Sequence, residues 1–193
     1  NPTLKVIFAH FFFMSAQLER LAEIFDMYPN VSVDLTPGIE MYTNFSKNVD
    51  KTRDFFIKYQ DRILFGTDIG AKALLVDPDE GIQFEESRGR VMVVRNFLES
   101  DSEFQLPDKS GFLFGGGEPA LRGICLPKEV LQKIYSSNFT RMVSESPRSL
   151  NPGMIAEFCD QVEKMIAIQG SSQPGVPGDT SIARMVKQYF QSV

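Results

Sequence analysis

The sequence predicts an α/β fold built around a parallel sheet, and three observations lead to that prediction. Apolar segments typical of buried strands begin near Leu4, Val31 and Arg62. The steps between them are about 27 and about 31 residues, the length of one strand and one returning helix. Apolar residues at helical spacing lie between the segments. Successive strand–helix units make right-handed crossovers, so their strands run parallel.

The first part of the chain supplies these units. We expect strands at Leu4–Ala9, Val31–Leu35 and Arg62–Gly66. Ser15 is expected to cap the first helix, whose apolar residues recur every three or four positions. After the second strand, a loop over Ile39–Asn48 should precede a second helix with Val49, Phe56 and Tyr59 on its inner face.

The pattern changes after the third strand, and the later part reads as mostly helical. The expected elements are a helix at Arg90–Leu98, a turn-rich stretch at Leu106–Gly117, a helix opening at Pro127, and amphipathic helices around Ile155–Ile166 and Ile182–Phe190. Proline is favoured at a first helical position. We therefore assign residues 1–145 to the strand–helix units, with a long insertion after the final strand. Residues 146–193 form a helical extension of the same domain.

Composition narrows the class of protein. The formal net charge is −5, the pI is about 5.0, and no basic run stands out, so nothing favours nucleic-acid binding. No apolar segment is long enough to cross a membrane, and the first residues do not have the pattern expected of a signal peptide. Cys125 and Cys159 lack metal-ligand spacing and are expected to be reduced, buried thiols. These features predict a cytoplasmic protein without a nucleic-acid or membrane partner.

Two side chains stand at equivalent places in the predicted sheet. His10, the single histidine, ends the first strand, and Asp68 follows the third. Carboxyl ends of parallel strands meet at one edge, where active sites form. A histidine and a carboxylate there can serve as metal ligands or as an acid/base pair. The alternatives are a satisfied core histidine and an aspartate that only forms a cap or Asx-turn.

Other residues near the same edge are candidates for substrate contact. Phe12, within the Phe11–Met14 run, could line an apolar pocket or pack beneath the loop. Glu40 could contact substrate or remain a solvated loop charge. Arg88 and Arg90 could meet a substrate carboxylate, or they could be two of the common arginines on a helix surface.

Several stretches carry a family resemblance: Val6-Ile-Phe-Ala-His10, Asp26 to Leu35 with its Pro-Asn strand entry, Arg62-Ile-Leu-Phe-Gly-Thr-Asp68, and Leu126 to Tyr135 followed by Asn138-Phe-Thr-Arg141. Over roughly Leu4 to Met142 the chain resembles the amidohydrolase superfamily. The branch it resembles holds metal-dependent hydrolases and related decarboxylases. Many relatives carry a glycine-containing turn where this chain has Phe11–Met14.

The resemblance implies a (β/α)8 TIM-type barrel, of which this chain would hold the last three strand–helix units plus extra C-terminal helices. Asp68 would bind the metal or take a proton from metal-bound water, and His10 would contact the metal or polarise the substrate. The implied cofactor is a divalent metal, zinc first and other ions as alternatives. The family's His-x-His pair and fifth-strand ligand have no counterpart here. Because the chain also begins at Asn1, we expect a fragment lacking its N-terminal barrel half.

The function implied is hydrolysis of a small organic substrate by metal-activated water, although this chain by itself is expected to lack a complete site. One alternative is a non-oxidative decarboxylase of the same superfamily. Another is a degenerate, metal-free barrel that acts as a binding protein. The expected partner is a small-molecule substrate, and a homo-oligomer is left open.

Overall fold

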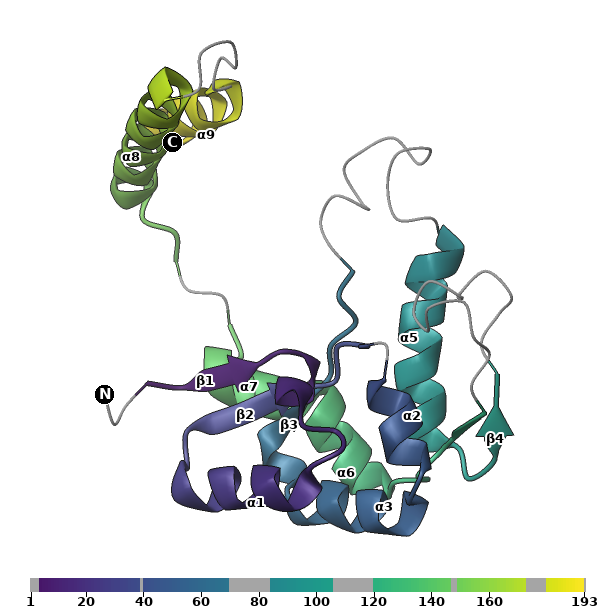
Figure 1. Ribbon diagram of the computed structural model, residues 1–193. Coiled ribbons are helices and arrows are strands. Elements are labelled where there is room, and N and C mark those ends of the chain that lie inside the picture. Colours follow the sequence, from purple (N-terminus) through teal and green to yellow (C-terminus); the bar gives the residue numbers. More distant parts are fainter. Residues whose placement is uncertain are drawn as a thin grey trace. The chain divides into compact units, whose positions relative to one another are not determined.

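The computed structural model describes residues 4–38, 40–69, 84–105, 120–146, 149–172 and 180–192. Two compact units make up the chain, Asn1–Glu145 and Ser146–Val193. The first unit contains the sheets and most of the helices, and the second is a pair of helices (Figure 1).

Three short strands form the main sheet of the first unit. β1 (Val6–Phe8), β2 (Val31–Asp34) and β3 (Ile63–Leu64) stand in that order across the sheet. Both pairings are parallel, with Val6 opposite Val31. The expected parallel sheet is therefore confirmed, although each strand is shorter than the apolar segment that predicted it.

The expectation of the last three strand–helix units of a (β/α)8 TIM-type barrel is wrong. Within the described ranges the parallel strands form an open sheet with β1 at one edge. β4 (Glu103–Phe104) and β5 (Leu121–Arg122) form a separate antiparallel pair. The spacing between the predicted strands does not distinguish the two folds, because open parallel sheets and barrels are built from the same strand–helix units. Closure takes about eight tilted strands with matched stagger, and these short strands do not supply it.

Helices follow β1 and β2, as the apolar periodicity predicts. α1 (Leu18–Met27) buries Leu21 and Phe25, and α3 (Val49–Lys58) buries Phe56. The two helices lie side by side below the sheet (Figure 1). Their apolar side chains share one face of each helix because they recur every three or four residues, so this face turns toward the core.

Two local predictions in this region are wrong. Ser15 does not cap α1, because its hydroxyl accepts a hydrogen bond from Asn44 Nδ2 (3.0 Å). The stretch predicted as a loop contains α2 (Met41–Ser46), whose buried residues are Met41, Tyr42 and Phe45. So short a helix is marginal without tertiary packing, and its six residues are too few to show a convincing period.

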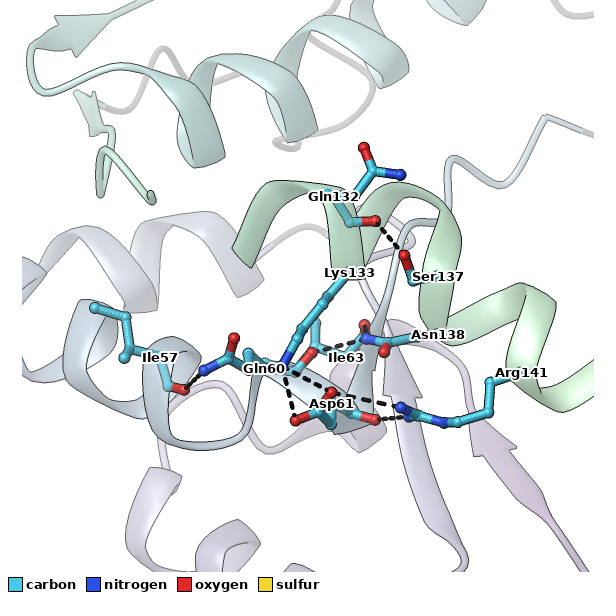
Figure 2. Close-up of polar contacts among 9 residues, drawn as sticks. All are labelled: Ile57, Gln60, Asp61, Ile63, Gln132, Lys133, Ser137, Asn138 and Arg141. Carbon is cyan, nitrogen blue, oxygen red and sulfur yellow. Dashed lines mark hydrogen bonds and ion pairs between the residues drawn. The ribbon is translucent and has the colours of Figure 1, made fainter. Parts of the chain in front are cut away.

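A continuous segment covers the outer edge of β3. It consists of α6 (Lys128–Gln132), the π-helical turn η4 (Lys133–Ser137) and α7 (Asn138–Val143). The backbone N–H of Phe65 donates to the carbonyl of Ile134 (2.9 Å), and Asn138 Nδ2 donates to the carbonyl of Ile63 (2.8 Å; Figure 2). These bonds pair backbone groups that an edge strand leaves open, so β3 is fixed against α7.

The core of the first unit is an aromatic cluster. Phe11 is fully buried, stacks on Phe56 (5.6 Å between ring centroids) and meets Phe45 edge-on (4.9 Å). Phe97 of α5 (Phe84–Glu99) stacks on Phe45 at 5.2 Å. α5 extends the helix predicted over its second half, whereas the predicted turn-rich stretch at 106–117 lies outside the described residues. The cluster joins the end of β1 to three helices.

The second unit consists of α8 (Pro152–Ser172) and α9 (Ser181–Gln191), both predicted from their periodicity. Lys187 pairs with Asp160, and Arg184 Nε lies 3.2 Å from Glu163 Oε2. Large apolar side chains remain exposed on both helices; they include Met154, Phe158, Met165, Ile182, Met185 and Tyr189. Throughout the part of the chain that the structure describes, no helix combines the length and apolarity needed to span a membrane.

Candidate functional site at the carboxyl ends of the strands

Asp34 occupies the centre of the sheet's carboxyl edge. It is the last residue of the middle strand, and its Oδ1 accepts hydrogen bonds from the backbone N–H groups of His10 (3.0 Å) and Thr36 (3.0 Å). The first bond ties the end of β1 to β2, and the second fixes the turn after β2. Burial raises the pKa of Tyr42 well above its usual value, and the charge of Asp34 raises it further. Through its hydrogen bond with the N–H of His10, Asp34 positions the backbone that carries the His10 side chain.

A left-handed turn follows β1. His10, Phe11, Phe12 and Phe13 have φ angles of 54°, 53°, 56° and 55°. Left-handed backbone costs a non-glycine residue about 1–2 kcal/mol, so four in succession need compensation. The buried Phe11 ring provides part of it, and Phe12 stacks on Phe8 at 3.9 Å. Backbone strain of this kind clusters at functional sites.

The imidazole of His10 contains a buried nitrogen without a partner. Nδ1 is enclosed and makes no hydrogen bond within the described ranges. A Cβ at Gly38 would lie 3.9 Å from Nδ1, and the Phe13 ring lies 5.3 Å from the imidazole centroid. Leaving a buried polar group unpaired costs about 1–3 kcal/mol. The alternative of a satisfied core histidine is therefore wrong, and Nδ1 is the atom at this edge that would gain most from a ligand.

Asp68 lies beyond the end of β3, where it pairs with an arginine. Its backbone is left-handed (φ 58°), a conformation that aspartate tolerates. Its Oδ2 accepts a hydrogen bond from Arg90 Nη1 (3.1 Å). The side chain of Arg90 is 6% exposed and that of Asp68 is 54% exposed. The alternative of an arginine on a helix surface is thus wrong for Arg90, which reaches from α5 toward the strand ends, whereas Arg88 is exposed.

The structure does not bring the residues predicted from the sequence, His10, Asp68, Glu40 and Phe12, into one hydrogen-bonded group within the described ranges. No hydrogen bond joins His10 to Asp68 among the residues with described positions. Glu40 is exposed just before α2, and its side chain makes no capping bond. Phe12 is half buried against the core. Substrate contact by Glu40 and Phe12 stays a prediction.

Gly66 brings the end of β3 close to the end of β2. A Cβ at Gly66 would lie 2.6 Å from Thr36 Oγ1 and 3.2 Å from Asp34 Cγ. A side chain at this position would collide with the buried Thr36 or move the carboxylate of Asp34. The glycine of the Gly-Thr-Asp stretch is therefore required by this close approach.

The donor set only partly fits a zinc site. Imidazole nitrogen and carboxylate oxygen are zinc ligands, and a zinc site uses about three of them from the protein. Across the described ranges, no three His, Cys, Asp or Glu side chains form a group that could hold a metal ion. The unpaired Nδ1 of His10 fits one ligand position, but these residues by themselves do not fit a complete zinc site.

No protein-family model, curated protein or solved structure matches this chain. The amidohydrolase resemblance therefore depends on the sequence stretches quoted above.

Sequence patterns single out neither Asp34 nor the burial of Arg90. Asp34 carried a weaker signal than His10, because it lies within the predicted strand Val31–Leu35 and is the last strand residue only in the structure. Its central place became evident only once β2 was seen between β1 and β3. Arg90 carried no such signal, since its burial depends on how α5 packs.

Proposed function

We propose that His10, Asp34 and Asp68 belong to a metal-dependent hydrolytic site that acts on a small organic acid or ester. The observation that carries this proposal is the buried, unpaired Nδ1 of His10 at the carboxyl edge of the sheet. The sequence resemblance to amidohydrolases supports the reaction class. The remaining ligands of a complete site would come from outside the described residues.

Each residue has a separate task in this proposal. His10 offers Nδ1 as one ligand, and Asp34 holds its backbone in place through Oδ1. Asp68 is exposed enough to accept a proton from water, and Arg90 orients its carboxylate. A divalent ion, when bound, would lower the pKa of water and polarise a carbonyl.

The test uses the single histidine of the chain as a spectroscopic probe. We expect added Zn²⁺ to shift the ¹⁵N resonance of His10 Nδ1 in the 193-residue chain, because one free imidazole nitrogen is enough for weak, saturable binding even where the site is incomplete. His10→Gln should abolish this binding, because it removes the imidazole. Asp101→Asn is the control, since it removes an exposed carboxylate from the turn between α5 and β4, outside the main sheet, and should leave the titration unchanged.

A metal-free binding protein is the second candidate. It is favoured by the ion pair of Asp68 with Arg90, which occupies the predicted metal-binding carboxylate. If Zn²⁺ leaves the His10 resonances unchanged, this candidate replaces the first. If zinc binds, comparing released acid with released CO₂ separates hydrolysis from the alternative, non-oxidative decarboxylation.

A cytoplasmic location forms part of the same proposal. Cys125 and Cys159 are both free thiols, as reducing compartments favour. The expectation that both would be buried is correct for Cys159 and wrong for Cys125, which is exposed.

A further inference from the structure

A hollow of 210 Å³ opens at the opposite end of the main sheet, where the strands begin. Lys5 precedes β1, Ser32 lies near the start of β2, and Arg62 directly precedes β3. Arg141 of α7 lies in the wall of the same hollow. In a parallel sheet these positions lie at the end opposite to His10 and Asp34, so the hollow is separate from the site described above.

Positive charge is in excess around this hollow. Asp61 is the carboxylate that lines the hollow, and it is already paired with two cations. Its Oδ1 lies 3.1 Å from Lys133 Nζ and 3.4 Å from Arg141 Nη1. Figure 2 shows both cations converging on Asp61. Asp26 is a further carboxylate near Arg62.

Among the residues that line the hollow, three cations (Lys5, Arg62 and Arg141) stand against one carboxylate (Asp61), an excess of two positive charges.

Arg62 is a cation held in place without a carboxylate partner. Its guanidinium donates to the carbonyls of Val31 and Tyr28 and lies 4.9 Å from the ring centroid of Phe25. Within the described residues no ion pair reaches it. Burial lowers the pKa of Arg62, and the charge of Arg141 lowers it further. Two guanidinium groups are thus close enough to repel each other, which a bound anion would relieve.

Hydrogen-bond donors remain available at the hollow. Lys5 Nζ makes one long bond, to the carbonyl of Arg141 (3.4 Å), although an ammonium has three donors. Arg141 uses Nη1 and Nη2 on Asp61, while its Nε donates to no described group. The hydroxyl of Ser32 is a further donor in the wall. Arginine and lysine donors around a confined space are the usual means of binding oxyanions.

We propose that this hollow is a binding site for a small doubly charged oxyanion, namely inorganic phosphate or the phosphate group of a small phosphomonoester. The excess of two positive charges matches a dianion. The volume is below that of pockets for drug-sized ligands, about 300–1,000 Å³, so the phosphate group itself is the part that enters.

The test is equilibrium dialysis of the 193-residue chain with radiolabelled inorganic phosphate at fixed ionic strength. We expect one saturable class of sites. Arg141→Gln should weaken phosphate binding at least tenfold, and Lys5→Gln several-fold. Arg20→Gln is the control, because it removes the same charge from an exposed position on α1 and should leave the affinity unchanged. Lys5 is exposed and makes a single long bond, so Lys5→Gln keeps the test valid if Arg141→Gln unfolds.

The outcomes separate specific from general anion binding. Competition by phenyl phosphate but not by acetate at the same ionic strength would support a phosphate site and extend it to phosphomonoesters. Competition by phosphate alone would restrict it to the free ion. Equal competition by acetate, equal affinities of Lys5→Gln and Arg20→Gln, or absence of saturable binding would overturn the proposal.

Discussion

The two compact units bury their apolar side chains to very different extents. In Asn1–Glu145, rings such as Phe11, Phe45 and Phe56 are fully buried and contact one another. In Ser146–Val193, Phe158 is 63% exposed, and α9 contains no buried residue. Both units nevertheless contain helices with clear apolar periodicity.

The difference shows that periodicity and stability are separate properties. An amphipathic helix gains most of its stability from the surface against which its apolar face packs. In the first unit that surface is an aromatic core, to which the left-handed turn after β1 contributes. In the second unit the described contacts between helices include ion pairs of partly exposed side chains, and pairs that remain open to solvent contribute about 0–1 kcal/mol each.

The largest expected effect is at Phe11. Phe11→Ala should lower the free energy of unfolding of the first unit by about 3–5 kcal/mol, because it leaves a cavity in the aromatic core. It also removes the ring that compensates the left-handed turn. Urea unfolding followed by circular dichroism measures this loss.

Phe158→Ala is the matched control in the second unit. The ring is exposed, so we expect a change within about 0.5 kcal/mol. Similar losses in the two variants would contradict the comparison, since they would mean that α8 is as well packed in solution as the core of the first unit.

A smaller effect is expected at Gly66. Gly66→Ala places a methyl group against Thr36 and Asp34 and should cost about 1–3 kcal/mol, as overpacking does. Gly153→Ala on α8 meets only Asn151 Oδ1 at 3.5 Å, so alanine should be neutral or stabilising by up to about 1 kcal/mol. Thermal unfolding of both variants tests this, and a harmless Gly66→Ala would show that the strand ends are farther apart.

The smallest effect is pH-dependent and involves Glu99. Arg95 lowers the pKa of Glu99, and the hydroxyl of Tyr135 also donates to its Oε1 (2.7 Å). A lowered carboxyl pKa adds stability above the ordinary value of 4.5, and this stability is lost as pH falls through the lowered pKa. Glu99→Gln should therefore lower the free energy of unfolding at neutral pH. The difference in this free energy between Glu99→Gln and the unmodified chain should shrink in acid.

Urea unfolding between neutral and acidic pH measures that difference. Glu163→Gln, which loses the ion pair with Arg184 in the second unit, is the control. A pH-independent difference for Glu99→Gln would mean that the Arg95 and Tyr135 contacts do not act on the ionised carboxylate.

Part of the candidate site could be predicted from the sequence. His10 and Asp68 follow predicted strands, and parallel strands place such residues at one edge of a sheet. The sequence did not reveal the partner of Asp68, which is Arg90, 22 residues farther along the chain, and not His10. The expected barrel was wrong because strand spacing specifies the crossover and leaves closure undetermined.

The sequence by itself determined most of the longer helices, the approximate places of the three main strands and their parallel direction. Apolar period and strand spacing are properties of nearby residues, which fix backbone geometry through short-range sterics and hydrogen bonds. Only the tertiary structure decided the open sheet, the burial of Arg90, the central place of Asp34 and the unpaired nitrogen of His10. These features arise from contacts between segments far apart in the chain, where the balance of burial, charge and hydrogen bonding is set by neighbours that no local pattern specifies.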